Sequence, residues 1–286
     1  MFKYDAAKGH QYRTETVEYI RRCLFSSDTD RPKPHHDKVL TVFKPIADAL
    51  RASYDRDRLE LVFKEVIFYI DCVEAEQRTL LSGGIPSKEE YWKYRMGVCC
   101  ARMGLIVNEY VLRHQQTTLI KKPSATTRPF TGLICFSLTT IFIHYRFANK
   151  TRLPPSLLHH PATSSLLDQI TIQLWHVNDL LSFKNEINEN QLSLIPILYA
   201  SSFSLQAAVD TCADEIREAG EMFEVLADQL RDQCKEEDDE AAAREAVEGF
   251  VLSCRYAYTG YVNWGVTTGR YGMQDAVTDK GLLLRV

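Results

Sequence analysis

The stretch SSLLDQITIQLWHVNDLLSFKNEIN, residues 164–188, predicts one long helix that carries the candidate chemistry of this chain. Asn178, Ser182 and Glu186 recur in it at every fourth position. Because a helix turns by about 100° per residue, each step of four advances by only about 40°, so the three side chains share one stripe. They offer an amide oxygen, a hydroxyl and a carboxylate, which suit Mg²⁺. Asp179, on a neighbouring face, is expected to hold a basic partner or an adjacent ligand.

The flanking sequence also predicts helices. The run Ser82-Gly83-Gly84-Ile85-Pro86 is expected to end one helix, and Ser87 with Glu90 gives the capping-box pattern that opens the next. Helices are expected over about 59–80, 87–111, 164–188, 204–234 and 239–268. Strand-like alternation is nearly absent. The chain is therefore expected to be all-α, with residues 1–286 forming a single domain.

Composition and charge exclude several classes of partner. The net charge is −4, from 34 basic and 38 acidic residues, which gives no electrostatic reason to expect nucleic acid. The apolar segment 130–145 has sixteen residues and carries Ser, Thr and His, whereas a membrane span needs roughly 20 apolar residues, so no membrane span is expected. The eight cysteines form no CxxC pair, and the polar start resembles no signal peptide. These features favour reduced thiols in a cytoplasmic protein.

Several motifs together resemble one family. The string N-D-x-x-S-x-x-x-E at 178–186 resembles the second metal motif of class I terpenoid synthases, and Arg270-Tyr271 resembles their C-terminal dyad that contacts diphosphate. The runs 90–97 (EYWKYRMG) and 260–264 (GYVNW) resemble the trichodiene synthase family in particular, with Arg95 in the place of its diphosphate-sensing arginine. The resemblance covers roughly 32–111 and 157–272.

The resemblance implies a function. It implies the α-helical terpenoid synthase bundle and a Mg²⁺-dependent sesquiterpene cyclase, a lyase of fungal secondary metabolism that ionises farnesyl diphosphate; it also implies a homodimer. Arg95 and Arg270 suit bidentate phosphate recognition, and Tyr271 adds a hydrogen bond. Lys184 and Trp264 complete the expected substrate site. Aromatic faces would stabilise the carbocation, and the candidates are Phe68, Tyr69, Trp175 and Trp264.

The sequence departs from the family pattern in three ways. No Asp-rich motif is found upstream of Arg95, so the N-terminal helices of the fold are expected to be missing. The stretch 112–155 lacks helical periodicity and turn chemistry, and is interpreted as an atypical insertion: translated intron sequence or a real loop. Lys184 stands one position before the family's lysine, which aligns with Asn185, and that shift turns a side chain by about 100° on a helix.

Two other functions therefore stay open. One is an inactive or truncated family member that only binds diphosphate or pairs with another subunit. The other is a helical interaction protein in which the oxygen-bearing triad is a surface coincidence. A prenyl-chain elongating enzyme is disfavoured, because such enzymes use two Asp-rich motifs and none is found here.

Overall fold

A computed structural model describes residues 5–27, 30, 32, 37–111, 153–188, 192–273, 276–278 and 281–282. The described residues are almost entirely helical, which confirms the expected all-α class. The chain divides into two compact units, Met1–Gly84 with Trp92–Gln116, and Ile85–Tyr91 with Thr117–Val286. The expectation of a single domain over 1–286 stays a prediction.

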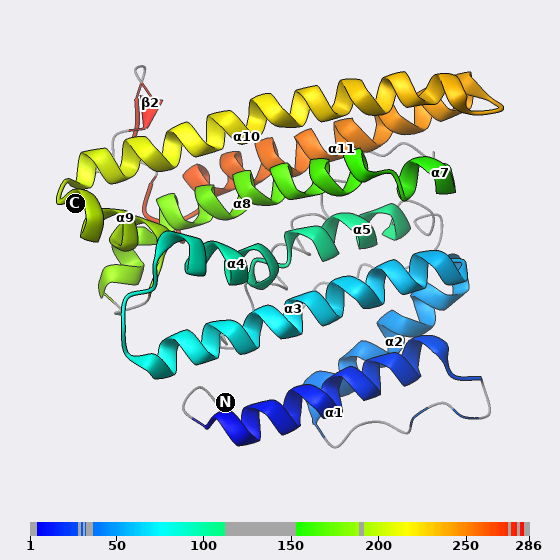
Figure 1. Ribbon diagram of the computed structural model, residues 1–286, viewed down its shortest axis with the longest axis horizontal. Coiled ribbons are helices and arrows are strands. Elements are labelled where there is room, and N and C mark those ends of the chain that lie inside the picture. Colours follow the sequence, from blue (N-terminus) through cyan, green and yellow to red (C-terminus); the bar gives the residue numbers. More distant parts are fainter. Residues whose placement is uncertain are drawn as a thin grey trace. The chain divides into compact units, whose positions relative to one another are not determined.

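The first unit is built on a bundle of long helices. Its helices are α1 (Ala6–Phe25), α2 (Lys38–Ser53), α3 (Arg56–Ser82) and α5 (Ala101–Val111), with the part of α4 (Lys88–Val98) that begins at Trp92. α1 packs against α2 and α3, as Figure 1 shows. Their apolar faces bury Tyr19, Leu24, Leu50 and Val66 in one core. This burial is the main source of stability for the unit.

The boundaries between α3, α4 and α5 follow local chemistry that the sequence predicted only in part. α3 ends at Gly83 in a left-handed conformation, with φ of 72°. The capping box is confirmed, because the Ser87 N–H donates to Glu90 Oε2 at 2.9 Å and the Glu90 N–H donates to Ser87 Oγ at 3.2 Å. The prediction of one continuous helix over 87–111 is wrong. Cys100 has φ of 57°, which interrupts the helical hydrogen-bond ladder between α4 and α5.

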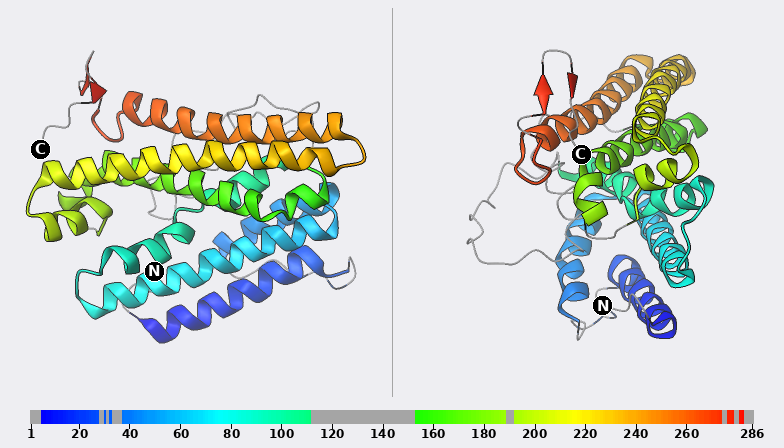
Figure 2. Two further views of the ribbon diagram at one scale, coloured as in Figure 1. Left: turned by 45° about the horizontal axis from the view of Figure 1, so that its top comes forward. Right: turned by 90° about the vertical axis from the view of Figure 1, so that its left-hand side faces the viewer.

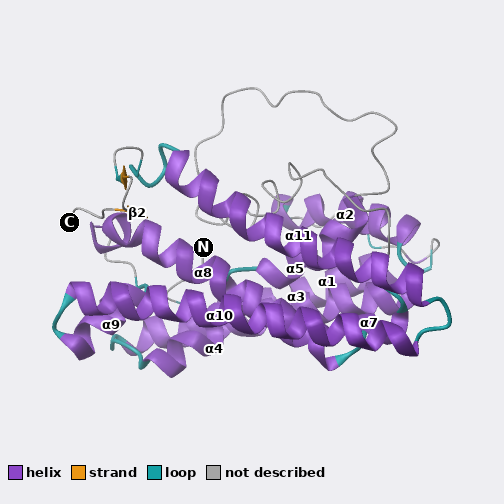
Figure 3. Ribbon diagram, turned by 90° about the horizontal axis from the view of Figure 1, so that it is seen from above, coloured by secondary structure: helices purple, strands orange, loops and turns teal. Residues whose placement is uncertain are grey.

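The second unit is built on three long helices. Its helices are α7 (Pro155–Leu158), α8 (Pro161–Asn188), α9 (Leu194–Ser202), α10 (Leu205–Gln233) and α11 (Glu240–Thr267), with a 3-10 turn at Cys234–Glu236. α8, α10 and α11 lie side by side, as the views in Figure 2 and Figure 3 show. Two short strands, β1 (Val277–Thr278) and β2 (Gly281–Leu282), pair antiparallel, with Val277 opposite Leu282. The core of the unit lies between the long helices and includes Leu166, Ile170, Leu174, Phe183 and Leu230.

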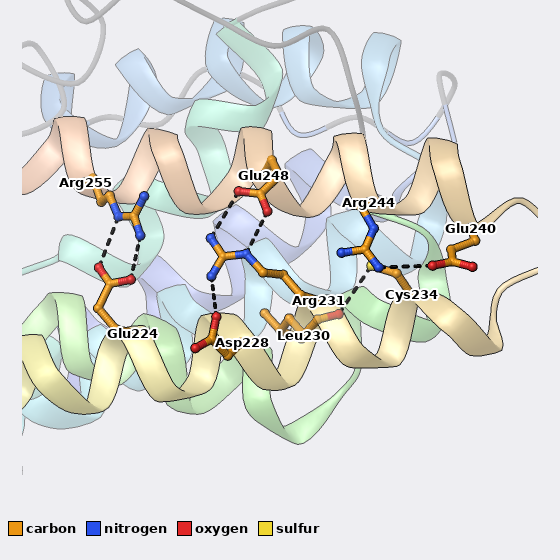
Figure 4. A network of polar contacts seen from close by, with 9 residues as sticks. All are labelled: Glu224, Asp228, Leu230, Arg231, Cys234, Glu240, Arg244, Glu248 and Arg255. Atoms are coloured by element: carbon orange, nitrogen blue, oxygen red, sulfur yellow. Dashed lines mark hydrogen bonds and ion pairs between the residues drawn. The ribbon is translucent and has the colours of Figure 1, made fainter.

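Charged side chains join α10 to α11 at the surface. Arg231 Nε donates to Glu248 at 2.7 Å, and Arg255 Nε donates to Glu224 at 3.1 Å (Figure 4). Asp239 caps the beginning of α11, because its Oδ1 accepts the Ala242 N–H at 3.0 Å. Exposed pairs of this kind contribute about 0.2–1 kcal/mol each, so they align the two helices more than they stabilise them.

Several expectations fall partly or wholly outside the described residues. Segment 130–145 and most of the expected insertion 112–155 lie there. Among the helices that the structure describes, none is long and apolar enough to cross a membrane. Six cysteines, at 23, 72, 99, 212, 234 and 254, are free and buried. Cys135 lies outside the described residues, and for Cys100 and Cys135 the expectation of reduced thiols stays a prediction.

Candidate metal and diphosphate site

The three predicted metal ligands lie on one unbroken helix. α8 runs without interruption from Pro161 to Asn188, so the four-residue spacing of Asn178, Ser182 and Glu186 becomes a single stripe. Asn178 and Ser182 are buried, whereas Glu186 is half-buried. The exposure of the side chains therefore increases from Asn178 inside the unit to Glu186 near its surface. This arrangement suits a cation that keeps some of its water ligands.

Two tyrosines hold the side-chain amide of Asn178. Its Nδ2 donates to the Tyr261 hydroxyl at 2.8 Å and to the Tyr271 hydroxyl at 3.1 Å. The two phenol oxygens also share a hydrogen bond of 3.1 Å. The amide oxygen Oδ1 is thus the end of the side chain that the two tyrosines do not use, and it is the end that a cation requires.

The hydroxyl hydrogen of Ser182 is also committed. Ser182 Oγ donates to the backbone carbonyl of Asn178 at 2.6 Å, which leaves the lone pairs of the oxygen for a donor or a cation. Among the described residues, no group of three or more His, Cys, Asp or Glu side chains could hold a metal ion. The donor set of the stripe is instead an amide, a hydroxyl and one carboxylate. Such a set fits Mg²⁺, which takes oxygen ligands and completes its octahedron with water and substrate phosphate.

Asp179 serves the packing of the helices. It is fully buried and accepts the Tyr91 hydroxyl at 2.5 Å and the Leu194 backbone N–H at 3.1 Å. Both of these donors are uncharged, and the basic partner or adjacent ligand expected from the sequence stays a prediction. The carboxylate thereby attaches the beginning of α9 and the Tyr91 side chain to α8, directly beside Asn178.

The segment after α11 brings the Arg-Tyr pair to α8. Tyr271 is buried, and Arg270 is exposed with its guanidinium carbon 5.5 Å from the centre of the Tyr271 ring. The backbone carbonyl of Arg270 accepts a hydrogen bond from Asn185 Nδ2 at 3.2 Å. Lys184, the predicted diphosphate ligand, lies on an exposed face. Asn185 thus contacts the Arg270 segment from the position where the family's lysine aligns, and the role of Lys184 as a diphosphate ligand stays a prediction.

Trp264 and Gly265 set the distance between α11 and α8. The Trp264 ring stacks on Tyr261 and meets the Tyr271 ring edge-on, with both pairs of ring centres 5.8 Å apart. A Cβ at Gly265 would lie 2.5 Å from Leu181 Cδ1, closer than any ordinary contact. A larger residue at this position would therefore force the Leu181 side chain to move, and the close approach of α11 to α8 accompanies the contact of Tyr261 with Asn178.

The remaining predicted site residues lie elsewhere. Arg95 belongs to the first unit and is half-buried on α4, and its part in a site stays a prediction. Phe68 and Tyr69 border a narrow crevice inside that unit, together with the ion pair of Arg102 and Glu65. Trp175 is buried in the second unit against Tyr91, with ring centres 6.0 Å apart. Its environment is that of a core residue.

A buried network of charged side chains lies one turn away from the metal stripe. Glu215 of α10 accepts from His176 Nε2 at 2.7 Å and forms an ion pair with Lys88. The other ring nitrogen of His176 lies 2.7 Å from the Ile172 carbonyl oxygen. Burial by itself raises the pKa of Glu215, but hydrogen bonds from His176 and Lys88 outweigh it and hold that pKa below its usual value. The network fixes residues 85–91 and α10 against α8.

Sequence reasoning did not identify Tyr261, Tyr91 or Asn185 as parts of this arrangement. Tyr261 appeared only within the run 260–264, and its contact with Asn178 spans 83 positions of the sequence. Tyr91 was noted only as a neighbour of Arg95. The sequence does place Tyr261 near the expected site, because it lies one helical turn before Trp264 and so shares the face of α11 that carries Trp264.

Comparison with known proteins connects this geometry to a family. Residues 3–126 and 130–221 match the family model described as terpene synthase family 2, C-terminal metal binding. The matched part includes the whole stripe from Asn178 to Glu186 and ends before Arg270. The stripe of oxygen ligands therefore falls in a domain that the family description associates with metal binding.

Curated relatives and solved structures agree with that match. The chain is 25% identical over 280 residues to the sesquiterpene cyclase hepA of Aspergillus oryzae, covering 95% of this chain and 65% of that protein. It is 24% identical over 268 residues to the terpene cyclase braA of Annulohypoxylon truncatum, covering 93% and 60%. The chain thus spans less than two thirds of the length of either relative.

The fold likeness extends to bacterial enzymes. The linalool/nerolidol synthase of Streptomyces clavuligerus, solved in complex with 2-fluorogeranyl diphosphate, aligns with a TM-score of 0.66 at 13% identity, over 94% of this chain and 77% of that one. At this identity the likeness shows the fold alone. It confirms the helical terpenoid synthase bundle that the sequence predicted.

Proposed function

This chain belongs to terpene synthase family 2, and on that premise we propose that its second unit holds Mg²⁺ and the diphosphate group of an isoprenoid substrate. Asn178, Ser182 and Glu186 would bind the cation through oxygen. Arg270 and Tyr271 would contact the diphosphate. The observation that carries the proposal is the unbroken helix α8, which places Asn178, Ser182 and Glu186 on one stripe.

The reaction proposed is the ionisation of farnesyl diphosphate followed by cyclisation of the carbocation, the chemistry of a carbon–oxygen lyase. Mg²⁺, when bound, would supply positive charge at the leaving oxygens. The guanidinium of Arg270 is exposed, so it can turn toward a diphosphate and bind two of its oxygens. The buried hydroxyl of Tyr271 keeps its place next to the metal stripe and can orient the same group.

Farnesyl diphosphate is the proposed substrate because one curated relative is named a sesquiterpene cyclase. The solved complex with 2-fluorogeranyl diphosphate concerns a relative with the same fold and supports an isoprenoid diphosphate in general. A closer kinship with trichodiene synthase, the homodimer and the cytoplasmic location stay predictions from the sequence. So does the expectation that Arg95 senses the diphosphate.

The proposal is tested with purified chain, farnesyl diphosphate and Mg²⁺, by measuring released diphosphate and volatile hydrocarbon. Glu186→Gln removes the one carboxylate of the stripe and should lower the rate by at least about 100-fold, since metal coordination is worth several kcal/mol. Glu218→Gln makes the same chemical change at an exposed position on α10 and should leave the rate unchanged. Equal rates for both variants would contradict the assignment of Glu186.

A second function stays a prediction from the sequence: an inactive or truncated family member that only binds diphosphate. A chain without the carboxylates that gather the other metal ions would bind diphosphate without turning over. Calorimetric titration with inorganic diphosphate and Mg²⁺ separates the two: binding without product supports the inactive member, and binding with product supports the cyclase. The remaining alternative is a helical interaction protein in which Asn178, Ser182 and Glu186 share a surface by coincidence. It conflicts with the burial of Asn178 and Ser182.

A further inference from the structure

Two asparagines of α8 contact the Arg270–Tyr271 pair. Asn178 Nδ2 donates to the Tyr271 hydroxyl at 3.1 Å, and Asn185 Nδ2 donates to the backbone carbonyl of Arg270 at 3.2 Å. We infer that Asn185 is a positioning residue, which holds the backbone of Arg270 beside the metal stripe so that the guanidinium can meet a diphosphate. This inference rests on the proposed function and assigns a role to an uncharged residue at the position of the family's lysine.

The geometry of α8 places both contacts along the metal stripe. Asn178 and Asn185 are seven positions apart, which is two helical turns less about 20°, and about 10 Å along the helix axis. Ser182 lies between them, and Glu186 follows Asn185 directly. All four side chains fall within about 100° of the helix circumference. The Arg-Tyr pair is therefore held by the side of α8 that carries the proposed cation ligands.

The backbone of Arg270 lies outside the hydrogen-bond ladder of a helix. α11 ends before Thr268, whose backbone is extended, with φ of −73° and ψ of 147°. After Arg270, the buried side chains of Tyr271 and Met273 attach the chain to the second unit. The Arg270 side chain itself is exposed. Asn185 therefore secures the one peptide group of this segment that leads directly into the buried Tyr271.

Asn185 is better suited to hold Arg270 than to bind a diphosphate by itself. Its amide carries no charge, whereas the guanidinium of Arg270 is always charged and can bind two phosphate oxygens. The amide nitrogen of Asn185 is directed at the Arg270 backbone. A restrained backbone lowers the conformational entropy that Arg270 loses when it binds an anion, which strengthens the binding. Asn185 thus acts through Arg270, and this role predicts results that direct contact does not.

The first test uses the peptide bond after Arg270, which trypsin can cleave. Cleavage requires the segment to leave α8, because the carbonyl oxygen that the protease must bind accepts from Asn185. Asn185→Leu keeps the size of the side chain and removes the donor. It should increase the rate of this cleavage by about two- to tenfold, as expected when the loss of one hydrogen bond raises the population of the open segment.

Two controls make the cleavage rate specific. The peptide bond after Lys235, exposed in the connection between α10 and α11, serves as the internal reference in the same digest. Gln229→Leu replaces an exposed amide of α10 by the same residue and should leave both cleavage rates unchanged. If Asn185→Leu does not change the ratio of the two rates, as followed by peptide mass spectrometry, the inference is overturned.

The second test measures the Kd for inorganic diphosphate in the presence of Mg²⁺ by calorimetric titration. Asn185→Leu should raise this Kd by about two- to tenfold, and Gln229→Leu should leave it unchanged. In a chain that already carries Arg270→Ala, adding Asn185→Leu should raise the Kd by less than about twofold, because no guanidinium is left to position. An equal rise in both backgrounds would show that Asn185 contacts the diphosphate by itself, and would contradict the inference.

The cleavage measurement uses neither metal nor diphosphate, which keeps the inference separate from the proposed function. If the natural chain binds no diphosphate, the proposed function fails, while the ratio of cleavage rates still decides whether Asn185 holds Arg270. If the natural chain binds diphosphate and the ratio does not respond to Asn185→Leu, the inference alone fails.

Discussion

Replacing Glu215 with Gln removes the negative charge from the buried network that joins α10 to α8 and to residues 85–91. In the natural chain one carboxylate oxygen accepts from His176 and the other pairs with Lys88. The backbone carbonyl of Ile172 is an acceptor, so His176 Nδ1 carries a hydrogen. In the variant, the single amide oxygen can accept from one of the two former partners, and the amide NH₂ group faces the other donor.

The cost follows from how deeply each partner is buried. His176 is fully buried and Glu215 retains 13% of its side-chain exposure, whereas Lys88 retains 34% and can recruit water. Breaking a buried charged pair costs about 3–5 kcal/mol, and the exposure of Lys88 places this case near about 3 kcal/mol. With an unfolding entropy of about 2.1 cal/mol/K per residue, that loss corresponds to a fall of about 5 °C in Tm.

Thermal unfolding followed by circular dichroism measures this difference at several pH values. The pKa of Glu215 is lower in the folded chain than its ordinary value of 4.5, so its charge stabilises the fold above about that pH. The stabilisation is lost as the pH falls through the lowered pKa. The Tm difference between the natural chain and Glu215→Gln should therefore be full near neutral pH and shrink below pH 4.5.

The matched control is Glu218→Gln, which makes the same change one helical turn later at an exposed position of α10. Its Tm should stay close to that of the natural chain, because exposed single charges contribute little. If Glu215→Gln lowers the Tm no more than the control does, the network does not stabilise the fold and the reasoning is refuted. A difference independent of pH would refute the electrostatic explanation alone.

Three further outcomes are expected. Gly265→Ala should lower the free energy of unfolding by about 1–3 kcal/mol, because the new methyl meets Leu181. Gly220→Ala, whose nearest neighbours would be 4.0 Å away, should raise that free energy by about 0.5–1 kcal/mol. If both substitutions change the free energy of unfolding in the same direction, the packing argument is contradicted. Asp179→Ala should lower the free energy of unfolding in urea by about 3 kcal/mol or more, since each lost hydrogen bond to the carboxylate is worth about 1.5–3 kcal/mol. If the loss is no greater than that of Asp210→Ala, at an exposed position, Asp179 does not have this role. Burial raises the pKa of the Cys254 thiol to about 12, so iodoacetamide at pH 8 should leave Cys254 unlabelled in peptide mass spectra until denaturant is added; labelling of the native chain would show that the site opens.

Local chemistry made much of the helical framework predictable. The capping box at Ser87 and Glu90, the left-handed Gly83 and the cap at Asp239 each depend on residues within three or four positions. Where a contact between residues far apart in the sequence determines the local structure, the prediction from the sequence was wrong or incomplete. The helix expected through 87–111 is broken at Cys100, next to Gly97, whose absent Cβ would lie 2.5 Å from Cys72 of α3. Such a contact between helices leaves no periodic trace in the sequence.

The sequence by itself determined the stripe of Asn178, Ser182 and Glu186, because a helix converts four-residue spacing into a shared face without help from the rest of the chain. Only the tertiary structure decided what surrounds that stripe. The packing of α11 on α8 at Gly265 brings Tyr261 to the amide of Asn178, and Asp179 points instead to Tyr91 and α9. Hydrogen bonds between helices depend on where two distant segments meet, and that distance is set by the packing of the whole core rather than by the spacing within one helix.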